Sequence, residues 1–326
     1  MDIFQLVIGL ILLLGGGEAV VRGASSLART FGVSPLAIGL TVVAFGTSAP
    51  ELAVNVTAAF QNQPGLSFGN IIGSNMANIG LVIGCCGMIR ALYIDSLVVS
   101  REIPMMLLAT VVTILMAADH MVDGDSPILD RGDGIVMLLF FSVFLYYTVG
   151  ELVRHRTDHP VLEDLVTNEL PGVRPRIAFS RDLLLTMAGF GALLYGASFT
   201  VDGATLLARR FDVPEEIIGM GIVAIGTSLP ELAAGLMATL RGHMELAIGT
   251  VIGSNVFNLL LVLAVTICIR PIEVPAGGMT DLAFVAFLSL ALMVVSITNR
   301  QQILRAEAGL LLLSYLGYLS WRSELL

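Results

Sequence analysis

Long apolar runs follow one another along almost the whole chain, and they constrain its fold more than any other feature. Each run extends for roughly 18 to 25 residues, long enough for a helix to cross about 30 Å of hydrocarbon. The composition agrees, because 56% of the residues are hydrophobic and only 13% are charged. Within lipid every backbone polar group must be paired inside the protein, and a helix pairs its own. The sequence therefore predicts an all-α polytopic membrane protein.

Turn residues divide the apolar sequence into ten predicted transmembrane helices. We place these helices at residues 3–28, 35–60, 66–90, 103–119, 134–153, 181–208, 214–240, 245–269, 280–298 and 304–321. The only long connection, 153–180, is a mixed-charge stretch that contains several prolines. It predicts a cytoplasmic linker between a first half, 1–152, and a second half, 181–326.

Two short motifs occur once in each half of the chain. Residues 44–51 read Ala-Phe-Gly-Thr-Ser-Ala-Pro-Glu, and residues 224–231 read Ala-Ile-Gly-Thr-Ser-Leu-Pro-Glu. A second motif, Gly-Ser-Asn-Met-Ala-Asn at 73–78, returns as Gly-Ser-Asn-Val-Phe-Asn at 253–258. Both motifs keep one offset of 180 residues between their copies. Each half holds five predicted spans, an odd number, so the second half must enter the membrane in the opposite sense. The chain is predicted to form two inverted five-helix repeats.

The arginines indicate how the spans are oriented, because cytoplasmic loops carry an excess of basic residues. All 17 basic residues are Arg. The side reached after the odd-numbered spans carries Arg29, Arg90, Arg101, Arg154, Arg156, Arg174, Arg176, Arg181, Arg241, Arg300 and Arg305. The opposite side carries Arg131, Arg209, Arg210, Arg270 and Arg322. This bias predicts a multi-pass protein of the plasma (inner) membrane with both termini outside the cytoplasm.

Glu51 and Glu231 place two carboxylates at bilayer depth, in equivalent positions of the two halves. An ionised carboxylate there costs several kcal/mol unless it faces a partner, water or an ion. Neither glutamate-bearing span contains a basic residue before its end. A shared cation is the natural partner for the pair. The alternative is a pair of protonated glutamic acids that only pack helices together.

The residues around each glutamate favour a broken helix rich in oxygen. Pro50 cannot donate to the carbonyl of Gly46, and Pro230 leaves the carbonyl of Gly226 free in the same way. Broken helices at the midplane of inverted repeats commonly bind ions in transporters. The further predicted ligands are the carbonyls near Ala44 and Ala224 and the side chains of Thr47, Ser48, Ser74, Asn78, Thr227, Ser228, Ser254 and Asn258. Such an all-oxygen cage with two negative charges suits Ca²⁺, which takes about 6–8 oxygen ligands.

These residues resemble the Ca²⁺/cation antiporter superfamily, specifically the Na⁺/Ca²⁺ exchanger family in its short prokaryotic form. The resemblance rests on Gly-Thr-Ser-x-Pro-Glu at 46–51 and 226–231 and on Gly-Ser-Asn-x-x-Asn at 73–78 and 253–258. It covers nearly the whole chain in span count and topology. It implies two central helix pairs, crossed by the first and sixth spans as a moving gate.

The resemblance implies a secondary antiporter that exchanges Na⁺ for Ca²⁺ by alternating access. Glu51 and Glu231 would bind Ca²⁺ directly, and Thr47 and Thr227 would contribute backbone carbonyls to both ions. The Na⁺ sites would be completed by Ser48, Ser74, Ser228, Ser254 and the carbonyls of Ala44 and Ala224. One residue departs from the pattern: where some members carry Asp, this chain has Asn258. That change leaves the proton sensitivity and the stoichiometry open.

The free energies of ion movement favour several Na⁺ per Ca²⁺ in a generic cell. Expelling Ca²⁺ against a ~10⁴-fold gradient and ~100 mV costs roughly 10 kcal/mol. One Na⁺ entering down a tenfold gradient supplies roughly 3.7 kcal/mol, so about three Na⁺ are needed.

Other functions remain open at this point. A Ca²⁺/H⁺ exchanger, or another monovalent/divalent cation exchanger, could use the same fold with the glutamates as proton carriers. A cation channel could use the same acidic residues. An enzyme is not expected, because no catalytic constellation lies within the spans. We expect no cofactor, with Ca²⁺ and Na⁺ bound as substrates. We expect the lipid bilayer as surroundings, no nucleic-acid partner and no obligatory protein partner.

Two further groups of charges have local structural interpretations. Glu18 and Arg22 are four residues apart in the first span, which predicts an ion pair along the helix. Asp130 and Asp133 precede the fifth span and are predicted to cap its helix.

Overall fold

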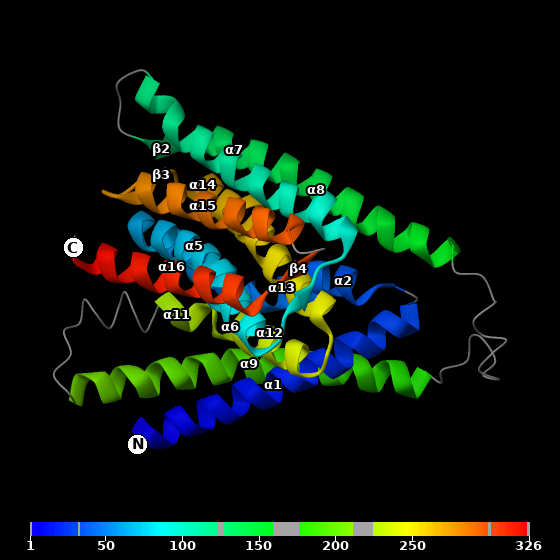
Figure 1. Cartoon of the computed structure of the whole chain (residues 1–326). Helices are drawn as coiled ribbons and strands as arrows, with labels where there is room; N and C mark the ends of the chain where they lie inside the picture. Colours follow the sequence, from blue (N-terminus) through cyan, green and yellow to red (C-terminus); the bar gives the residue numbers. More distant parts are fainter. Residues whose placement is uncertain are drawn as a thin grey trace.

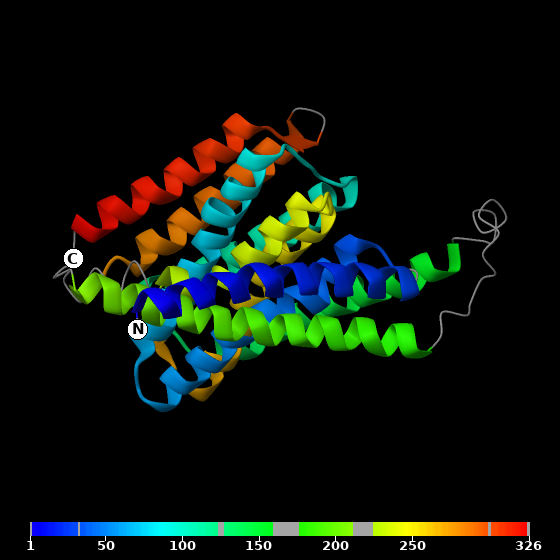
Figure 2. The same cartoon turned by 90° about the horizontal axis from the view of Figure 1, so that it is seen from below.

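The computed structural model describes residues 2–31, 33–122, 127–158, 176–210, 224–298 and 301–324. Most helices extend between the same two ends of the molecule, and both chain termini lie at the same end (Figures 1 and 2). Apart from two short sheets, the described chain is helical, as predicted.

The first half consists of α-helices (α), π-helical turns (η) and two short strands. In order they are α1 (Asp2–Phe31), α2 (Pro35–Ile38), η1 (Gly39–Val43), α3 (Ala44–Thr47), α4 (Ala49–Phe60), α5 (Pro64–Ala77), η2 (Asn78–Ile83), α6 (Gly84–Ile89), β1 (Leu92–Tyr93), η3 (Val98–Glu102), α7 (Ile103–Val122), β2 (Ile128–Leu129) and α8 (Arg131–Asp158).

The described part of the second half follows a similar order. Its elements are α9 (Arg176–Arg210), α11 (Ala224–Thr227), α12 (Leu229–Leu240), α13 (Met244–Phe257), η5 (Asn258–Leu263), α14 (Ala264–Ile269), β3 (Ile272–Glu273), α15 (Gly278–Ile297), β4 (Gln302–Ile303) and α16 (Arg305–Glu324). From α4 to β1 each element has a counterpart with bounds 180 residues later, in α12 to β3. The internal repeat of the sequence is therefore also a repeat of structure.

The described residues contain seven helices long and apolar enough to cross a membrane, or eight if one bent pair counts as a span. The predicted spans 214–240 and 304–321 are not among them. Residues 211–223 lie outside the described part, and charged residues at both ends of α16 lower its mean hydropathy. The polytopic helical fold is confirmed, while the count of ten spans stays a prediction. Helical residues also extend into the predicted linker 153–180, because α8 continues to Asp158 and α9 begins at Arg176.

The two spans that carry the second motif form the centre of the molecule. In Pro64–Ile89 and in Met244–Ile269, 78% of the apolar window is buried, against 28% for Ile3–Ala28 in α1. Each of these central spans changes from α-helix to a π-helical turn at the last asparagine of its motif, Asn78 or Asn258. Such turns inside helices are frequent at functional sites.

The long helices α1 and α9 lie side by side along one flank of this centre (Figures 1 and 2). Their backbones approach closely because glycines face the partner helix. A Cβ at Gly16 would lie 2.8 Å from the amide nitrogen of Leu193, and a Cβ at Gly189 would lie 2.8 Å from that of Val20. Small residues at helix contacts permit this packing within a membrane.

Two small antiparallel sheets join the halves. Strand β1 pairs with β4, with Leu92 opposite Ile303, and β2 pairs with β3, with Leu129 opposite Ile272. Each sheet therefore takes one strand from each half of the chain.

Two arginines reinforce these joints at helix ends. Arg305 at the start of α16 donates to the carbonyl of Ile89 at 2.9 Å, and Arg131 at the start of α8 donates to that of Ile269 at 3.4 Å. Both carbonyls end a helix, where unpaired oxygens and the helix dipole favour a positive charge. Each half thus caps a central helix of the other.

The predicted cap of the fifth span is confirmed. Asp130 Oδ1 accepts hydrogen bonds from the amides of Gly132 at 2.6 Å and Asp133 at 3.1 Å. Asp133 Oδ2 accepts in return from the amide of Asp130 at 2.7 Å. This reciprocal arrangement pairs amides that the first turn of α8 would otherwise leave unsatisfied.

Candidate cation-binding site

Both glutamate motifs interrupt their helices, as predicted from their prolines. Ser48 separates α3 from α4 with φ −84° and ψ 0°, and the two parts of this span meet at a bend of 42°. Ser228 separates α11 from α12 with φ −89° and ψ 2°. In each case the proline lies in the first turn of the following helix, where its missing N–H is tolerated. The glutamate follows directly in the same turn.

The two carboxylates are fully buried but differ in their hydrogen bonds. Glu51 and Glu231 each have 0% relative exposure. Glu231 Oε1 accepts from the hydroxyls of Ser48 and Ser254, both at 3.4 Å. Among the described residues neither oxygen of Glu51, nor Oε2 of Glu231, has a hydrogen-bond partner. The site thus collects side chains from both halves around two carboxylates.

Hydroxyl pairs join the broken helices to the central spans across the repeat boundary. Thr47 Oγ1 lies 3.4 Å from Ser254 Oγ, and Thr227 Oγ1 lies 3.3 Å from Ser74 Oγ. The two pairs are related by the internal repeat. The structure therefore brings together four of the predicted Thr and Ser ligands. They form two pairs, and each pair takes one residue from each half of the chain.

The predicted asparagine ligands lie where the central spans turn from α- to π-helix. Asn78 Nδ2 donates to Asn255 Oδ1 at 3.1 Å, which links the two halves again. Asn258 is fully buried, and within the described part of the chain neither its oxygen nor its nitrogen has a partner. Element η5, which begins at Asn258, contacts α4 and α5 of the first half. Asn258 therefore lies on the same central assembly as Asn78.

Unpaired buried polar atoms gather on these motif helices. Among the described residues, those here are Glu51 Oε1 and Oε2, Asn55 Oδ1, Asn75 Oδ1, Asn78 Oδ1, Ser228 Oγ, Glu231 Oε2 and Asn258 Nδ2 and Oδ1. Native proteins pair nearly all such atoms, and exceptions call for an explanation such as an ion. All but one of these atoms are oxygens, which are the ligands of hard cations. The donor set fits Na⁺ or Ca²⁺.

The described residues contain no cluster of three or more His, Cys, Asp or Glu that could hold a metal ion. The charge at this site therefore comes from the two glutamates, and neutral oxygens supply the rest. The carbonyl of Ala44 accepts from Thr47 Oγ1 at 3.3 Å and from the Ser48 amide at 2.9 Å, so it is engaged within its own helix. Its counterpart Ala224 begins α11.

Two residues near this site were not anticipated from the sequence. Asn55 Nδ2 donates to the Glu51 carbonyl at 2.7 Å and to Asn70 Oδ1 at 2.8 Å. Asn70 Nδ2 donates in turn to Thr227 Oγ1 at 3.2 Å. The search for motifs shared by the two repeats does not find Asn55 and Asn70, because Gly235 and Thr250 occupy the equivalent positions in the second repeat.

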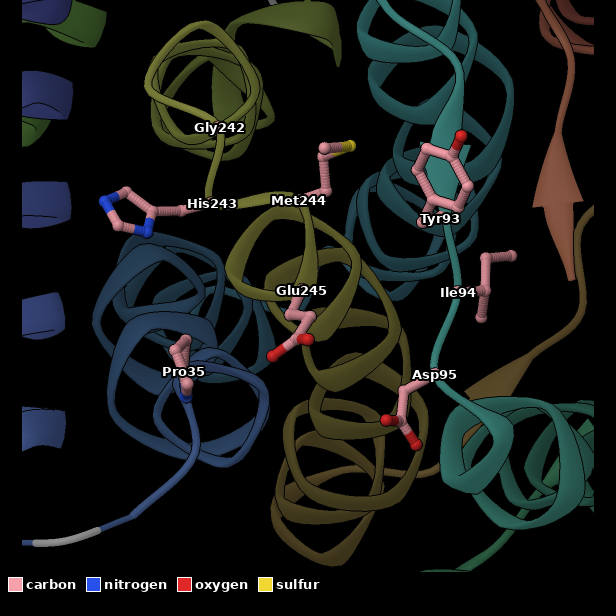
Figure 3. Close-up of a pocket in the computed structure, with 8 residues that line it drawn as sticks. All are labelled: Pro35, Tyr93, Ile94, Asp95, Gly242, His243, Met244 and Glu245. Carbon is pink, nitrogen blue, oxygen red and sulfur yellow. The ribbon is translucent and has the colours of Figure 1, made fainter. Parts of the chain in front are cut away.

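A separate cavity of about 380 Å³ lies at the turn between α12 and α13. It is lined by Pro35, Tyr93, Ile94, Asp95, Gly242, His243, Met244 and Glu245, which Figure 3 shows. The carboxylates of Asp95 and Glu245 come to it from different segments (Figure 3). None of the predicted cation ligands lines this cavity, so it is distinct from the site between the glutamates.

Known proteins share both the sequence and the fold of this chain. A family described as sodium/calcium exchanger protein matches residues 1–150 and 182–323. A putative antiporter, CaxA, from Alkalimonas amylolytica is 39% identical over 319 residues, 97% of this chain and 96% of the relative. Inner membrane protein YrbG from Escherichia coli is 35% identical over 328 residues, 98% of this chain and 97% of the relative.

A relative named as a sodium/calcium exchanger and a solved structure extend this comparison. Sodium/calcium exchanger MaX1 from Methanosarcina acetivorans is 27% identical over 336 residues, 96% of each chain. The structure of the sodium-calcium exchanger NCX_Mj soaked with 10 mM Na⁺ and zero Ca²⁺ superimposes with a TM-score of 0.82, covers 98% of both chains and is 30% identical. The family match spans most of the chain and coincides with both motif pairs. The chain therefore belongs to the sodium/calcium exchanger protein family, whose members are transporters and not enzymes.

Proposed function

We propose that this protein exchanges Na⁺ for Ca²⁺ across a membrane, through the site between Glu51 and Glu231. One observation carries the proposal: two fully buried carboxylates share a centre with a set of buried oxygens that lack partners within the described chain. A buried carboxylate without a counter-charge is costly, and a cation bound between the two removes that cost. The family membership and the likeness to NCX_Mj support the same ions.

The proposed ligand roles follow the two repeats. Glu51 and Glu231 bind Ca²⁺ directly, while Thr47 and Thr227 contribute backbone carbonyls to Ca²⁺ and Na⁺. The Na⁺ sites are completed by Ser48, Ser74, Ser228, Ser254 and the carbonyls of Ala44 and Ala224, with Asn78 and Asn258 beside them. Since these oxygens serve both ions, Na⁺ and Ca²⁺ compete for them. A stoichiometry of about three Na⁺ per Ca²⁺ satisfies the energy balance of a generic cell.

The proposed topology has ten spans in two inverted repeats, 1–152 and 181–326, joined by a cytoplasmic linker at 153–180. Two features support it: the equal spacing of the elements from α4 to β1 and from α12 to β3, and the position of both termini at one end of the molecule (Figure 1). The arginine distribution supports an orientation with this end outside the cytoplasm of a plasma membrane.

Alternating access is assigned to the α1–α9 pair moving against the central helices. Glycines let α1 and α9 pack closely on each other, so they can move as one unit. This pair touches both motif breaks, because a Cβ at Gly46 or at Gly226 would meet Phe190 or Val201 of α9. A displacement of α9 therefore changes the surroundings of both glutamate turns.

Ca²⁺/H⁺ exchange is the second candidate. The buried carboxylates have no basic side chain among their partners in the described structure, so protons could neutralise them in place of Na⁺. Asn258 does not exclude this mechanism, because it leaves both glutamates in place.

The deciding experiment measures ⁴⁵Ca²⁺ uptake into proteoliposomes loaded with Na⁺ or with choline, at clamped pH. We expect uptake from Na⁺-loaded vesicles alone, and its loss in Glu51→Gln. Glu273→Gln, at an exposed glutamate of β3, is the matched control and should transport like wild type. Uptake that ignores Na⁺ but follows an imposed pH gradient would replace the first candidate by the second.

A further inference from the structure

One difference between the two halves of the cation site is a chain of amides that runs from the first repeat to Thr227. Asn55 Nδ2 donates to the Glu51 carbonyl at 2.7 Å and to Asn70 Oδ1 at 2.8 Å. Asn70 Nδ2 donates to Thr227 Oγ1 at 3.2 Å. The chain connects the turn that carries one glutamate to the turn just before the other break. It spans α4, α5 and α11.

The second repeat shows that the fold does not need this chain. Helices α12 and α13 form the same kind of pair as α4 and α5, with Gly235 and Thr250 in place of Asn55 and Asn70. Thr250 Oγ1 donates to the Leu246 carbonyl of its own helix at 2.8 Å. A glycine and a self-bonded threonine therefore suffice to pack such a pair.

Asn55 is also costly where it lies. Asn55 is fully buried, and its Oδ1 has no partner in the described part of the chain. A buried amide that is only partly hydrogen-bonded lowers stability. A requirement other than packing therefore explains Asn55, which donates to Asn70, better than the fold does.

An amide of the other repeat reaches Thr227, whereas the residue equivalent to Asn70 on the Thr47 side is Thr250, which bonds within its own helix. Thr47 Oγ1 donates within its own helix, to the carbonyl of Val43 at 3.0 Å, and its side chain is fully buried. Thr227 receives a hydrogen bond from Asn70 of the other repeat, and it is only half-buried. The Asn70 amide thus ties α11, which ends at Thr227, to the central span α5.

We propose that Asn70, supported by Asn55, is a positioning residue for the transported cation. It fixes Thr227, and with it the turn at Ser228, from the first repeat. This makes the two halves of the site unequal. The inference rests on the proposed function, because it takes the Thr227 turn as part of the cation site. Asn70 itself need not touch the ion.

The test converts the first repeat to the chemistry of the second. Asn70→Thr places a hydroxyl that can bond its own helix, as Thr250 does, and removes the amide that reaches Thr227. Losing one such hydrogen bond should raise the Na⁺ and Ca²⁺ concentrations for half-maximal exchange about fivefold, within the range for a single bond. The maximal rate should change by less than about twofold, as expected for a lost binding contribution. Thr250→Ala is the matched control and should leave both concentrations unchanged.

A double-mutant cycle separates positioning from a general loss of folding. Thr227→Val removes the hydroxyl that accepts the amide but keeps the backbone carbonyl. If Asn70 acts through that hydroxyl, the double variant should resemble Thr227→Val alone. Its half-maximal Na⁺ and Ca²⁺ concentrations should differ from those of Thr227→Val by less than about 1.5-fold, because the effects of coupled residues are not additive. Fully additive shifts, or an Asn70→Thr protein indistinguishable from Thr250→Ala, would overturn the inference.

Direct binding distinguishes this failure from failure of the proposed function. The rise in the thermal unfolding midpoint on adding CaCl₂ or NaCl is measured for each purified variant in detergent. In one outcome, the wild-type protein exchanges ions and both salts raise its unfolding midpoint, and Asn70→Thr gives the same results. That outcome overturns only the role of Asn70. Wild-type protein that neither exchanges nor responds to either salt overturns the proposed function, and this inference with it.

Discussion

Arg241 at the end of α12 donates through Nε to Glu18 Oε2 of α1 at 2.8 Å. Glu18 also pairs with Arg22 of its own helix, as the spacing of these residues predicts. The repeat-related positions hold Ser198 and Gln61, which cannot form an ion pair. Within the described residues, the ion pair that ties α1 to α12 therefore has no counterpart at the repeat-related positions of α9 and α4.

We expect Glu18→Gln to change the exchange turnover by about two- to fivefold and to leave the half-maximal Na⁺ and Ca²⁺ concentrations unchanged. The Arg241 side chain is 47% exposed, so the pair contributes at most about 1 kcal/mol to stability. Its loss should instead alter how readily α1 moves against α12. The measurement is ⁴⁵Ca²⁺ flux at varied Na⁺ in proteoliposomes. A shift in the half-maximal concentrations with unchanged turnover would contradict this role.

Glu51→Gln should have opposite effects on stability and on cation response. In wild type neither Glu51 oxygen has a partner among the described residues, so a neutral amide should raise the unfolding midpoint in the absence of Na⁺ and Ca²⁺. The same change removes one of two charges from the ion and should weaken Ca²⁺ binding about 100-fold or more. Thermal unfolding with and without CaCl₂ measures both effects. Glu231→Gln should raise the cation-free midpoint less, because Ser48 and Ser254 already donate to Glu231.

The two symmetry-related asparagines should differ in their tolerance of Asp. Asn258→Asp adds a negative charge to the cage without breaking a described hydrogen bond, since neither polar atom of Asn258 has a partner. Attraction to a divalent ion should lower the half-maximal Ca²⁺ concentration about tenfold. Asn78→Asp instead loses the donor to Asn255 Oδ1 and sets two acceptors against each other. It should lower the unfolding midpoint, whereas equal behaviour of the two variants in Ca²⁺ titrations and unfolding would refute the distinction.

The glycines between α1 and α9 should not tolerate a side chain. A Cβ at Gly189 would lie 2.8 Å from Val20 Cγ2 and from the Val20 amide nitrogen, so Gly189→Ala must separate the helices. Overpacking of this kind costs about 1–3 kcal/mol. Gly191, on the same helix, has no atom within 4 Å of its Cβ position, and Gly191→Ala should be neutral or slightly stabilising. Unfolding midpoints and exchange rates of the two variants provide the comparison. A loss of stability in both would point to a cause other than the close contact at Gly189, because alanine has a higher helix propensity than glycine.

Local patterns in the sequence predict much of this architecture. The apolar runs predict the helical fold, and Pro50 and Pro230 predict the breaks observed at Ser48 and Ser228. The spacing of Asp130 and Asp133 predicts the cap of α8. These features depend on residues a few positions apart, so a pattern along the chain contains the necessary information. The duplication of the motifs then predicts that Glu51 and Glu231 belong to one site.

The pairing of oxygens across the site was decided only by the tertiary structure. Ser48 donates to Glu231 and Asn70 to Thr227 over sequence separations of 183 and 157 residues. The Glu18–Arg241 pair spans 223 residues. Such contacts depend on how the two halves of the chain pack on each other, which side-chain type and spacing do not encode locally. The sequence by itself determined that there are two related half-sites. The packing of α5 against α11 and of α1 against α12 decided that these half-sites are unequal.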